Sequence, residues 1–117
     1  MNIDWKKPTA SMLGRFQPFH EGHKALFKEI LKRTGQVIIM IRDTGGTDDS
    51  NPFDFNDVKK NIEKSLKKYA GKFEIIKVPN ITNVCYGRGV GWKIEKISLP
   101  KKIEEISATK IRGKMQI

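Results

Sequence analysis

The chain carries the stretch GRFQPFHEGH at residues 14–23, and the rest of the sequence is organised around it. A short apolar run at residues 9–16 leads into it and predicts a strand that ends before the breaker Pro18. Both histidines of the chain, His20 and His23, lie inside this stretch. The pattern predicts a tight corner between a strand and a helix, with two imidazoles at the start of the helix.

Hydrophobic spacing on the carboxyl side of this corner predicts an α/β order. Helices are expected over residues 21–33 and 54–70, because their apolar positions recur at helical spacing. Strands are expected over residues 36–42 and 73–79, and the first of these is almost continuously apolar. Such a run is typical of a strand covered on both faces in a parallel sheet.

The second half of the chain is harder to arrange. Residues 82–86 and 93–99 are expected to form a fourth and a fifth strand, yet only two residues separate 79 from 82. A parallel crossover takes about a dozen residues or more. We therefore predict one α/β domain over residues 1–117, with a mostly parallel sheet of four to five strands and helices on both faces. Its second half is trimmed or partly antiparallel.

Composition narrows the class of protein. With 117 residues, 38% hydrophobic and 31% charged, the chain suits one globular domain. No apolar run approaches the roughly 18 residues of a membrane span, and the first residues lack the apolar core of a secretion signal. A cytoplasmic protein without a membrane partner is expected. The single cysteine, Cys85, excludes an internal disulfide.

The formal net charge of +10 favours anionic partners. Nucleic acid is not the expected partner, because the aromatic residues flank turns instead of alternating with basic side chains. A small nucleic-acid-binding protein stays open as a minority hypothesis.

An exposed sheet edge would need protection, so a homo-oligomer is also expected.

The two histidines suit a polyphosphate site. Imidazoles near a helix N-terminus, with a glycine that allows close backbone approach, favour a negatively charged ligand. Zinc would need three or four ligands, so no metal site is predicted. On these residues alone, a surface turn with incidental histidines explains the pattern equally well.

The complete stretch changes this balance, because GRFQPFHEGH resembles the signature of the HxGH nucleotidylyltransferase superfamily. Its form is that of archaeal-type nicotinamide-mononucleotide adenylyltransferases. NPF at residues 51–53 looks like part of that group's second loop. ISATKIR at residues 106–112 is similar to the Ile-Ser-x-Thr-x-Ile-Arg/Lys element of the superfamily, which also occurs in cytidylyltransferases. The resemblance implies a Rossmann-like fold.

It also implies a reaction and a set of site residues. Members transfer a nucleotidyl group from a nucleoside triphosphate to a phosphate-bearing small-molecule acceptor and release pyrophosphate, by direct in-line attack. His20 and His23 would donate to the phosphates as clamps and not as bases, and Arg112 would contact the leaving pyrophosphate. Mg²⁺ would be carried by the nucleotide phosphates.

Further residues follow from the same resemblance. Six are expected to bind nucleotide or phosphate: Gly14, Arg15, Phe16, Gly22, Ser107 and Thr109. Arg88 and Asn51 are candidate contacts to the base or the acceptor.

Three activities stay open. ATP is favoured as the nucleotide and nicotinamide mononucleotide is a candidate acceptor. A CTP-dependent cytidylyltransferase of the glycerol-3-phosphate type is the first alternative. The second is a non-catalytic nucleotide-binding module, because residues 90–106 leave little room for the helix and strand that fuller members carry there.

Overall fold

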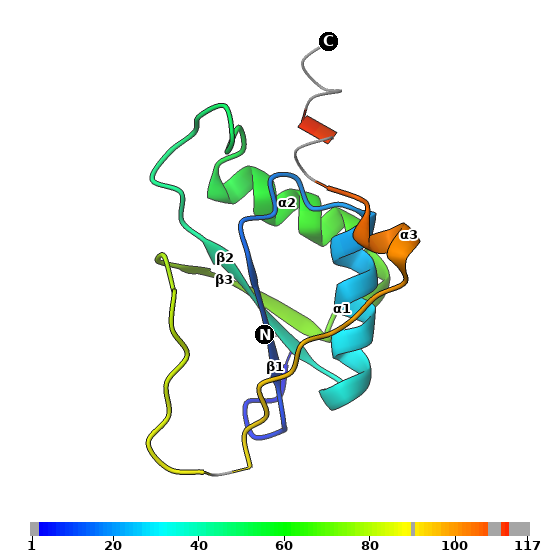
Figure 1. Cartoon of the computed structure of the whole chain (residues 1–117), viewed down its shortest axis with the longest axis vertical. Helices are drawn as coiled ribbons and strands as arrows, with labels where there is room; N and C mark the ends of the chain where they lie inside the picture. Colours follow the sequence, from blue (N-terminus) through cyan, green and yellow to red (C-terminus); the bar gives the residue numbers. More distant parts are fainter. Residues whose placement is uncertain (1–2, 90, 108–110, 113–117) are drawn as a thin grey trace.

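The structure, a computed structural model, describes residues 3–89, 91–107 and 111–112. Its centre is a parallel sheet of three strands in the order β1-β2-β3 (Figure 1). The strands are β1 at Ala10–Gly14, β2 at Val37–Arg42 and β3 at Phe73–Val78. The pairing registers Met12 with Ile39 and Ile39 with Ile75. The predicted α/β class with a parallel sheet is confirmed.

Two helices make the crossovers. Helix α1, Glu21–Thr34, joins β1 to β2 and ends at Gly35, whose φ of 83° gives the left-handed turn that donates its N–H to Leu31 O at 2.8 Å. Helix α2, Phe55–Ser65, joins β2 to β3, and a 3-10 helix η1 follows it at Lys67–Tyr69. The single helix expected over residues 54–70 is therefore divided, and η1 brings the Tyr69 ring to 5.5 Å from Phe27.

Both helices cover the same face of the sheet, which corrects the expectation of helices on both faces. Phe27 of α1 and Ile62 of α2 share one buried cluster with Ile39 of β2. Successive crossovers step in one direction across the order β1-β2-β3, so right-handed connections place both helices on one side. Along β2, burial alternates between full and partial. The strand expected to be covered on both faces is fully covered on one.

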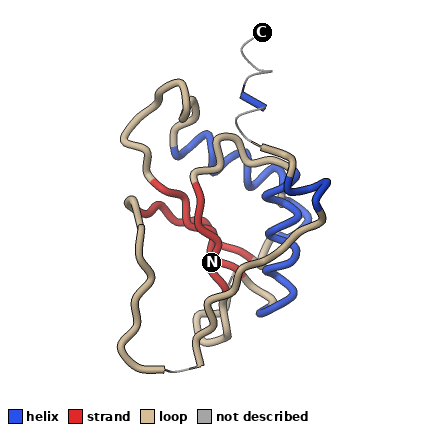
Figure 2. The backbone as a smooth tube through the Cα atoms, in the orientation of Figure 1, coloured by secondary structure: helices blue, strands red, loops and turns tan. Residues whose placement is uncertain are grey.

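The expected fourth and fifth strands were wrong for the described residues. Residues 79–89 and 91–100 lie in a long loop (Figure 2), and neither 82–86 nor 93–99 contains a described strand. The three residues between β3 and residue 82 cannot return the chain to the amino end of a parallel sheet. A short helix α3, Lys101–Glu104, follows this loop. Ser107 also predicts a helix N-cap by its residue type, and the short helix that would follow it lies largely outside the described residues.

The described sheet leaves the outer edges of β1 and β3 without a strand partner. This agrees with the reason for expecting a homo-oligomer, which stays a prediction. Among the residues that the structure describes, no helix is long and apolar enough to cross a membrane.

Candidate active site

His20 caps the first turn of α1 with its own imidazole. Its Nδ1 accepts from the Gly22 N–H at 3.1 Å and from the His23 N–H at 3.4 Å. The His23 Nδ1 accepts from the His20 N–H at 3.2 Å. This is a reciprocal capping box in which imidazoles replace the usual hydroxyl and carboxylate. Two orphan amides of α1 and the amide of its N-cap residue are thereby satisfied.

The glycine between the two histidines has a steric reason. A Cβ added to Gly22 would lie 2.9 Å from Cε1 and 3.0 Å from Nδ1 of the His20 ring. Any larger residue would push the imidazole off the helix end. The spacing His-x-Gly-His is thus the spacing that lets the first histidine fold back over the helix start.

The hydrogen bonds also fix the tautomers. When Nδ1 of a neutral imidazole accepts, the proton lies on Nε2. Because both rings accept at Nδ1, both carry a donor at Nε2. The rings of His20 and His23 stack with centroids 3.7 Å apart at 20°. The site therefore holds two neutral Nε2–H donors side by side.

Packing keeps His23 neutral. The His23 ring packs edge-to-face with the Phe16 ring, with their centroids 4.9 Å apart. It also stacks on the Phe19 ring, with a centroid distance of 5.4 Å. Burial lowers the pKa of His23 from its ordinary 6.5 to about 4, and the adjacent His20 acts in the same direction. Burial also lowers the pKa of His20, while the Glu21 carboxylate opposes this shift. Neutral rings at physiological pH suit a role as hydrogen-bond donors.

Phe16 is a structural residue of the corner. Its ring is 3% exposed, and a Cβ added to Gly14 would lie 2.8 Å from Cε1 of this ring. The glycine that ends β1 therefore accommodates the Phe16 ring. The binding of a nucleotide by these two residues stays a prediction.

Two side chains of this corner, those of Arg15 and Gln17, contact the loop before α2. The Arg15 Nη1 donates to the Asn51 Oδ1 at 3.1 Å. The Gln17 side chain donates to Phe53 O at 2.8 Å and accepts from the Phe53 N–H at 2.9 Å. Asn51 is buried and also donates to the Asp48 carboxylate. Asn51 thus holds Arg15, and the exposed guanidinium still faces solvent.

Sequence reasoning missed Gln17 as a site residue. The sequence held no signal for this role, because the pairing of Arg15 with residue 51 and of Gln17 with residue 53, each at a sequence separation of 36, is seen only in the folded chain.

The carboxyl-terminal element reaches the same corner. Arg112 Nη1 donates to Gln17 O at 2.6 Å across 95 residues of sequence. Ser107 is half-buried and its carbonyl accepts from the Ile111 N–H at 3.2 Å, whereas Thr109 lies outside the described residues. The two stretches expected to cooperate are therefore brought together at Gln17. Arg88 is exposed in the loop between β3 and α3, and within the described residues no hydrogen bond or ion pair ties it to this corner.

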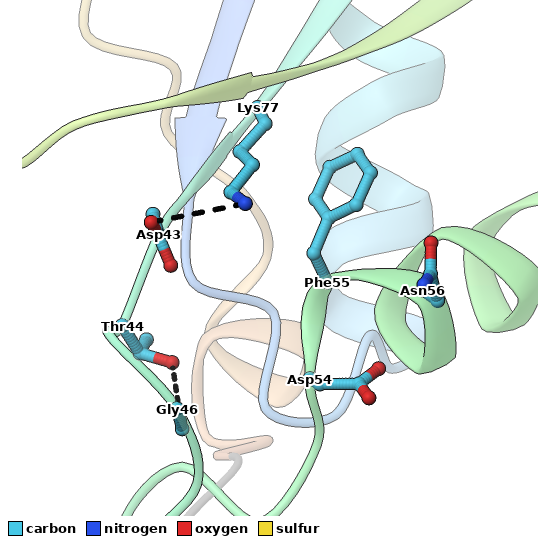
Figure 3. Close-up of a pocket in the computed structure, with 7 residues that line it drawn as sticks. All are labelled: Asp43, Thr44, Gly46, Asp54, Phe55, Asn56 and Lys77. Atoms are coloured by element: carbon cyan, nitrogen blue, oxygen red, sulfur yellow. Dashed lines mark hydrogen bonds and ion pairs between the residues drawn. The ribbon is translucent and has the colours of Figure 1, made fainter.

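A cleft of about 310 Å³ opens beside this corner, at the carboxyl ends of β2 and β3. In Figure 3 the amine of Lys77 points toward Asp43, and the Phe55 ring stands opposite them. Lys77 Nζ lies 3.9 Å from Asp43 Oδ2 and 5.7 Å from the centroid of Phe55. The seven lining residues are Asp43, Thr44, Gly46, Asp54, Phe55, Asn56 and Lys77.

Within the described residues, no group of three or more His, Cys, Asp or Glu side chains is placed to hold a metal ion.

Known proteins are similar to much of this chain. The family model described as cytidylyltransferase-like matches residues 12–77. A nicotinamide-nucleotide adenylyltransferase of Methanococcus aeolicus is 37% identical over 73 residues, which is 62% of this chain and 42% of that protein. Another nicotinamide-nucleotide adenylyltransferase, from Thermoplasma acidophilum, is 37% identical over 67 residues, or 54% of this chain and 36% of that protein. The chain thus spans less than half the length of these curated relatives.

A solved structure shows the same likeness in three dimensions. A bifunctional NMN adenylyltransferase/ADP ribose pyrophosphatase from Francisella tularensis, complexed with AMP and a manganese ion, superposes with a TM-score of 0.58 at 31% identity. The match covers 63% of this chain and 23% of that one.

Proposed function

This chain belongs to the cytidylyltransferase-like family, and on that premise we propose that it transfers a nucleotidyl group from a nucleoside triphosphate to a phosphate-bearing acceptor. The observation that carries the proposal is the stacked pair of His20 and His23 rings at the start of α1, whose centroids lie 3.7 Å apart and which each present an Nε2–H donor. Donors fixed before the substrate arrives stabilise charge that develops in a transition state without reorganising.

In this proposal the triphosphate is bound by the two imidazoles and not by the backbone amides of Gly22 and His23. The N–H groups of Gly22 and His23 already donate to His20 Nδ1, so the helix start presents its positive end through the two rings. In the proposed reaction an oxygen of the acceptor phosphate attacks the α-phosphorus. The bond between that phosphorus and the bridging oxygen breaks, and pyrophosphate leaves with the electron pair. The attacking oxygen is already anionic, so the neutral histidines need not remove a proton.

Arg112 would meet the leaving group. Its guanidinium is held at the same loop through Gln17 O, and a guanidinium offers a planar fork of donors that suits phosphate oxygens. Ser107 and Thr109 remain proposed phosphate contacts. Mg²⁺, bound by phosphate oxygens and water, would supply additional charge neutralisation.

The acceptor would place its non-reacting end in the cleft beside Asp43. Ligands of open α/β sheets gather outside the carboxyl ends of the strands, where this cleft lies. It offers a cation at Lys77, a carboxylate at Asp43 and the ring of Phe55. Such a mixed lining suits a ring that carries both donors and acceptors, as nicotinamide mononucleotide does. This acceptor is proposed with ATP as the preferred nucleotide, and CTP with glycerol 3-phosphate is the alternative pair.

Pyrophosphate release tests the proposal. The protein is incubated with ATP or CTP, Mg²⁺ and a panel of phosphorylated acceptors that includes nicotinamide mononucleotide and glycerol 3-phosphate. One pair should release pyrophosphate, and His23→Ala should lower turnover by about 100- to 1,000-fold. Arg33→Ala, at the other end of α1, is the control and should retain turnover. No release with any pair from folded protein would refute the proposed activity.

A second candidate is a nucleotide-binding module without turnover. The observation that favours it is the long loop formed by residues 79–89 and 91–100, which adds no described strand to the sheet. Calorimetry that shows triphosphate binding dependent on His20, without pyrophosphate release in the panel above, would support this module instead.

A further inference from the structure

We propose that Gln17 is a positioning residue, which sets the histidine pair and Arg112 relative to one another; this inference rests on the proposed function. Gln17 is 3% exposed, although it lies in a loop between a strand and a helix. A buried carboxamide must find partners, because each unpaired polar group costs about 1–3 kcal/mol. The partners of Gln17 belong to two distant parts of the chain.

The first partner is the loop before α2. The Gln17 carboxamide exchanges two hydrogen bonds with the backbone of Phe53, at 2.8 and 2.9 Å. Only an amide side chain can both donate and accept in this way. Two residues earlier, Arg15 contacts Asn51 at 3.1 Å. The two loops therefore run side by side, held by contacts at positions 15 and 17.

These contacts bracket a strained residue. Phe16, between them, has a φ of 54°, a left-handed conformation that costs a bulky residue about 1–3 kcal/mol and persists only where the surroundings fix it. Its ring is the edge partner of the His23 ring at 4.9 Å. The contacts of Gln17 thus reach His23 through Phe16.

The second partner is the carboxyl-terminal element. The main-chain oxygen of Gln17 accepts from Arg112 Nη1 at 2.6 Å. The side chain of Gln17 fixes the loop, and its carbonyl then receives the guanidinium. A displacement of this loop by about 1 Å can cost about 100-fold in turnover when reacting groups must be aligned.

Two variants and one matched control test this role. Gln17→Ala removes the exchange with Phe53. Gln17→Glu keeps the shape but sets a carboxylate oxygen against the Phe53 carbonyl, which lies 2.8 Å from the present donor. The control is Gln36→Ala. Gln36 is also buried, at 7% exposed, and its side chain bonds Asp4 at the opposite end of the sheet.

Turnover gives the first measurement. Both Gln17 variants should lower kcat by about 100-fold, with the KM for the triphosphate nearly unchanged, because the loss concerns alignment. Gln36→Ala should lower the melting temperature at least as much and leave kcat unchanged. Equal losses of kcat in Gln17→Ala and Gln36→Ala would overturn the proposal, since the effect would then be one of stability.

The imidazole resonances give a second measurement that needs no turnover. The chain has two histidines, so their ring signals are readily separated by NMR. Loss of the Gln17 contacts should release Phe16 and raise the pKa of His23 from about 4 toward 6.5, while Gln36→Ala leaves it in place. An unchanged pKa of His23 in both Gln17 variants would overturn the proposal. Wild-type protein that releases no pyrophosphate would refute the proposed function alone, and this titration would still decide the role of Gln17.

Discussion

Protonation of His23 should lower the free energy of unfolding of the protein at mildly acidic pH. Burial among Phe16 and Phe19 holds the pKa of this imidazole near 4 in the folded chain, against 6.5 ordinarily. The unfolded state therefore binds more protons between these two values, and the free energy of unfolding falls as pH falls. The full contribution is present above pH 6.5 and is lost by about pH 4.

The magnitude follows from the two pKa values. A difference between 6.5 and about 4 corresponds to roughly 3 kcal/mol at 1.36 kcal/mol per pKa unit. About 2 kcal/mol of this is lost between pH 7 and pH 5. The pKa of His20 is also lowered, so its protonation acts in the same direction. The interval from pH 7 to pH 5 lies above the pKa values of the Glu29 and Asp48 carboxylates, which are lowered from their ordinary 4.5 and 3.8.

Urea unfolding at pH 7 and pH 5 measures the loss, with His23→Gln as the control. Glutamine at this position can still reach back to the His20 N–H, as in an ordinary capping box, but it does not titrate. The variant should lose about 2 kcal/mol less than the wild type over the same interval. An equal loss in both proteins would show that His23 is not the group responsible.

Three further substitutions test the packing. Gly22→Ala should cost about 1 kcal/mol in thermal unfolding, because its Cβ would displace the His20 ring from 2.9 Å; a gain in stability, as helix propensity alone would give, would contradict the wedge. Phe27→Ala should cost about 3–5 kcal/mol in urea, since this side chain is fully buried, and a cost below about 1 kcal/mol would place it outside the core. Gln36→Ala should cost about 1–3 kcal/mol by leaving the Asp4 backbone groups unpaired, and an unchanged melting temperature would refute that role.

Local patterns predicted the elements whose causes are local. The apolar spacing of α1 and Gly35 at its end are read directly from the sequence, and the structure ends α1 there. The β-branched run of β2 is equally legible. The division of the second helix at Leu66 was missed, because the Tyr69 contact with Phe27 depends on where α1 lies.

The number of strands and their coverage depended on topology. Residues 82–86 have the composition of a strand, but the three residues that separate them from β3 are too few for a parallel crossover, and residues 82–86 form no strand pairing in the structure. The side on which α2 packs follows from the strand order, which hydrophobic periodicity does not contain. Both helices consequently cover the face that holds Ile39.

The sequence alone determined the chemistry of the corner at residues 14–23, because His-x-Gly-His is a local device: two imidazoles cap the helix that they begin, and the glycine leaves room for the first. Tertiary structure alone decided what this corner is joined to. Gln17 meets Phe53 and Arg112 across 36 and 95 residues, and such contacts depend on how the chain returns to the carboxyl end of its sheet. Burial by Phe16 and Phe19, which keeps His23 neutral, is likewise a property of the folded corner, since an exposed imidazole would titrate near 6.5.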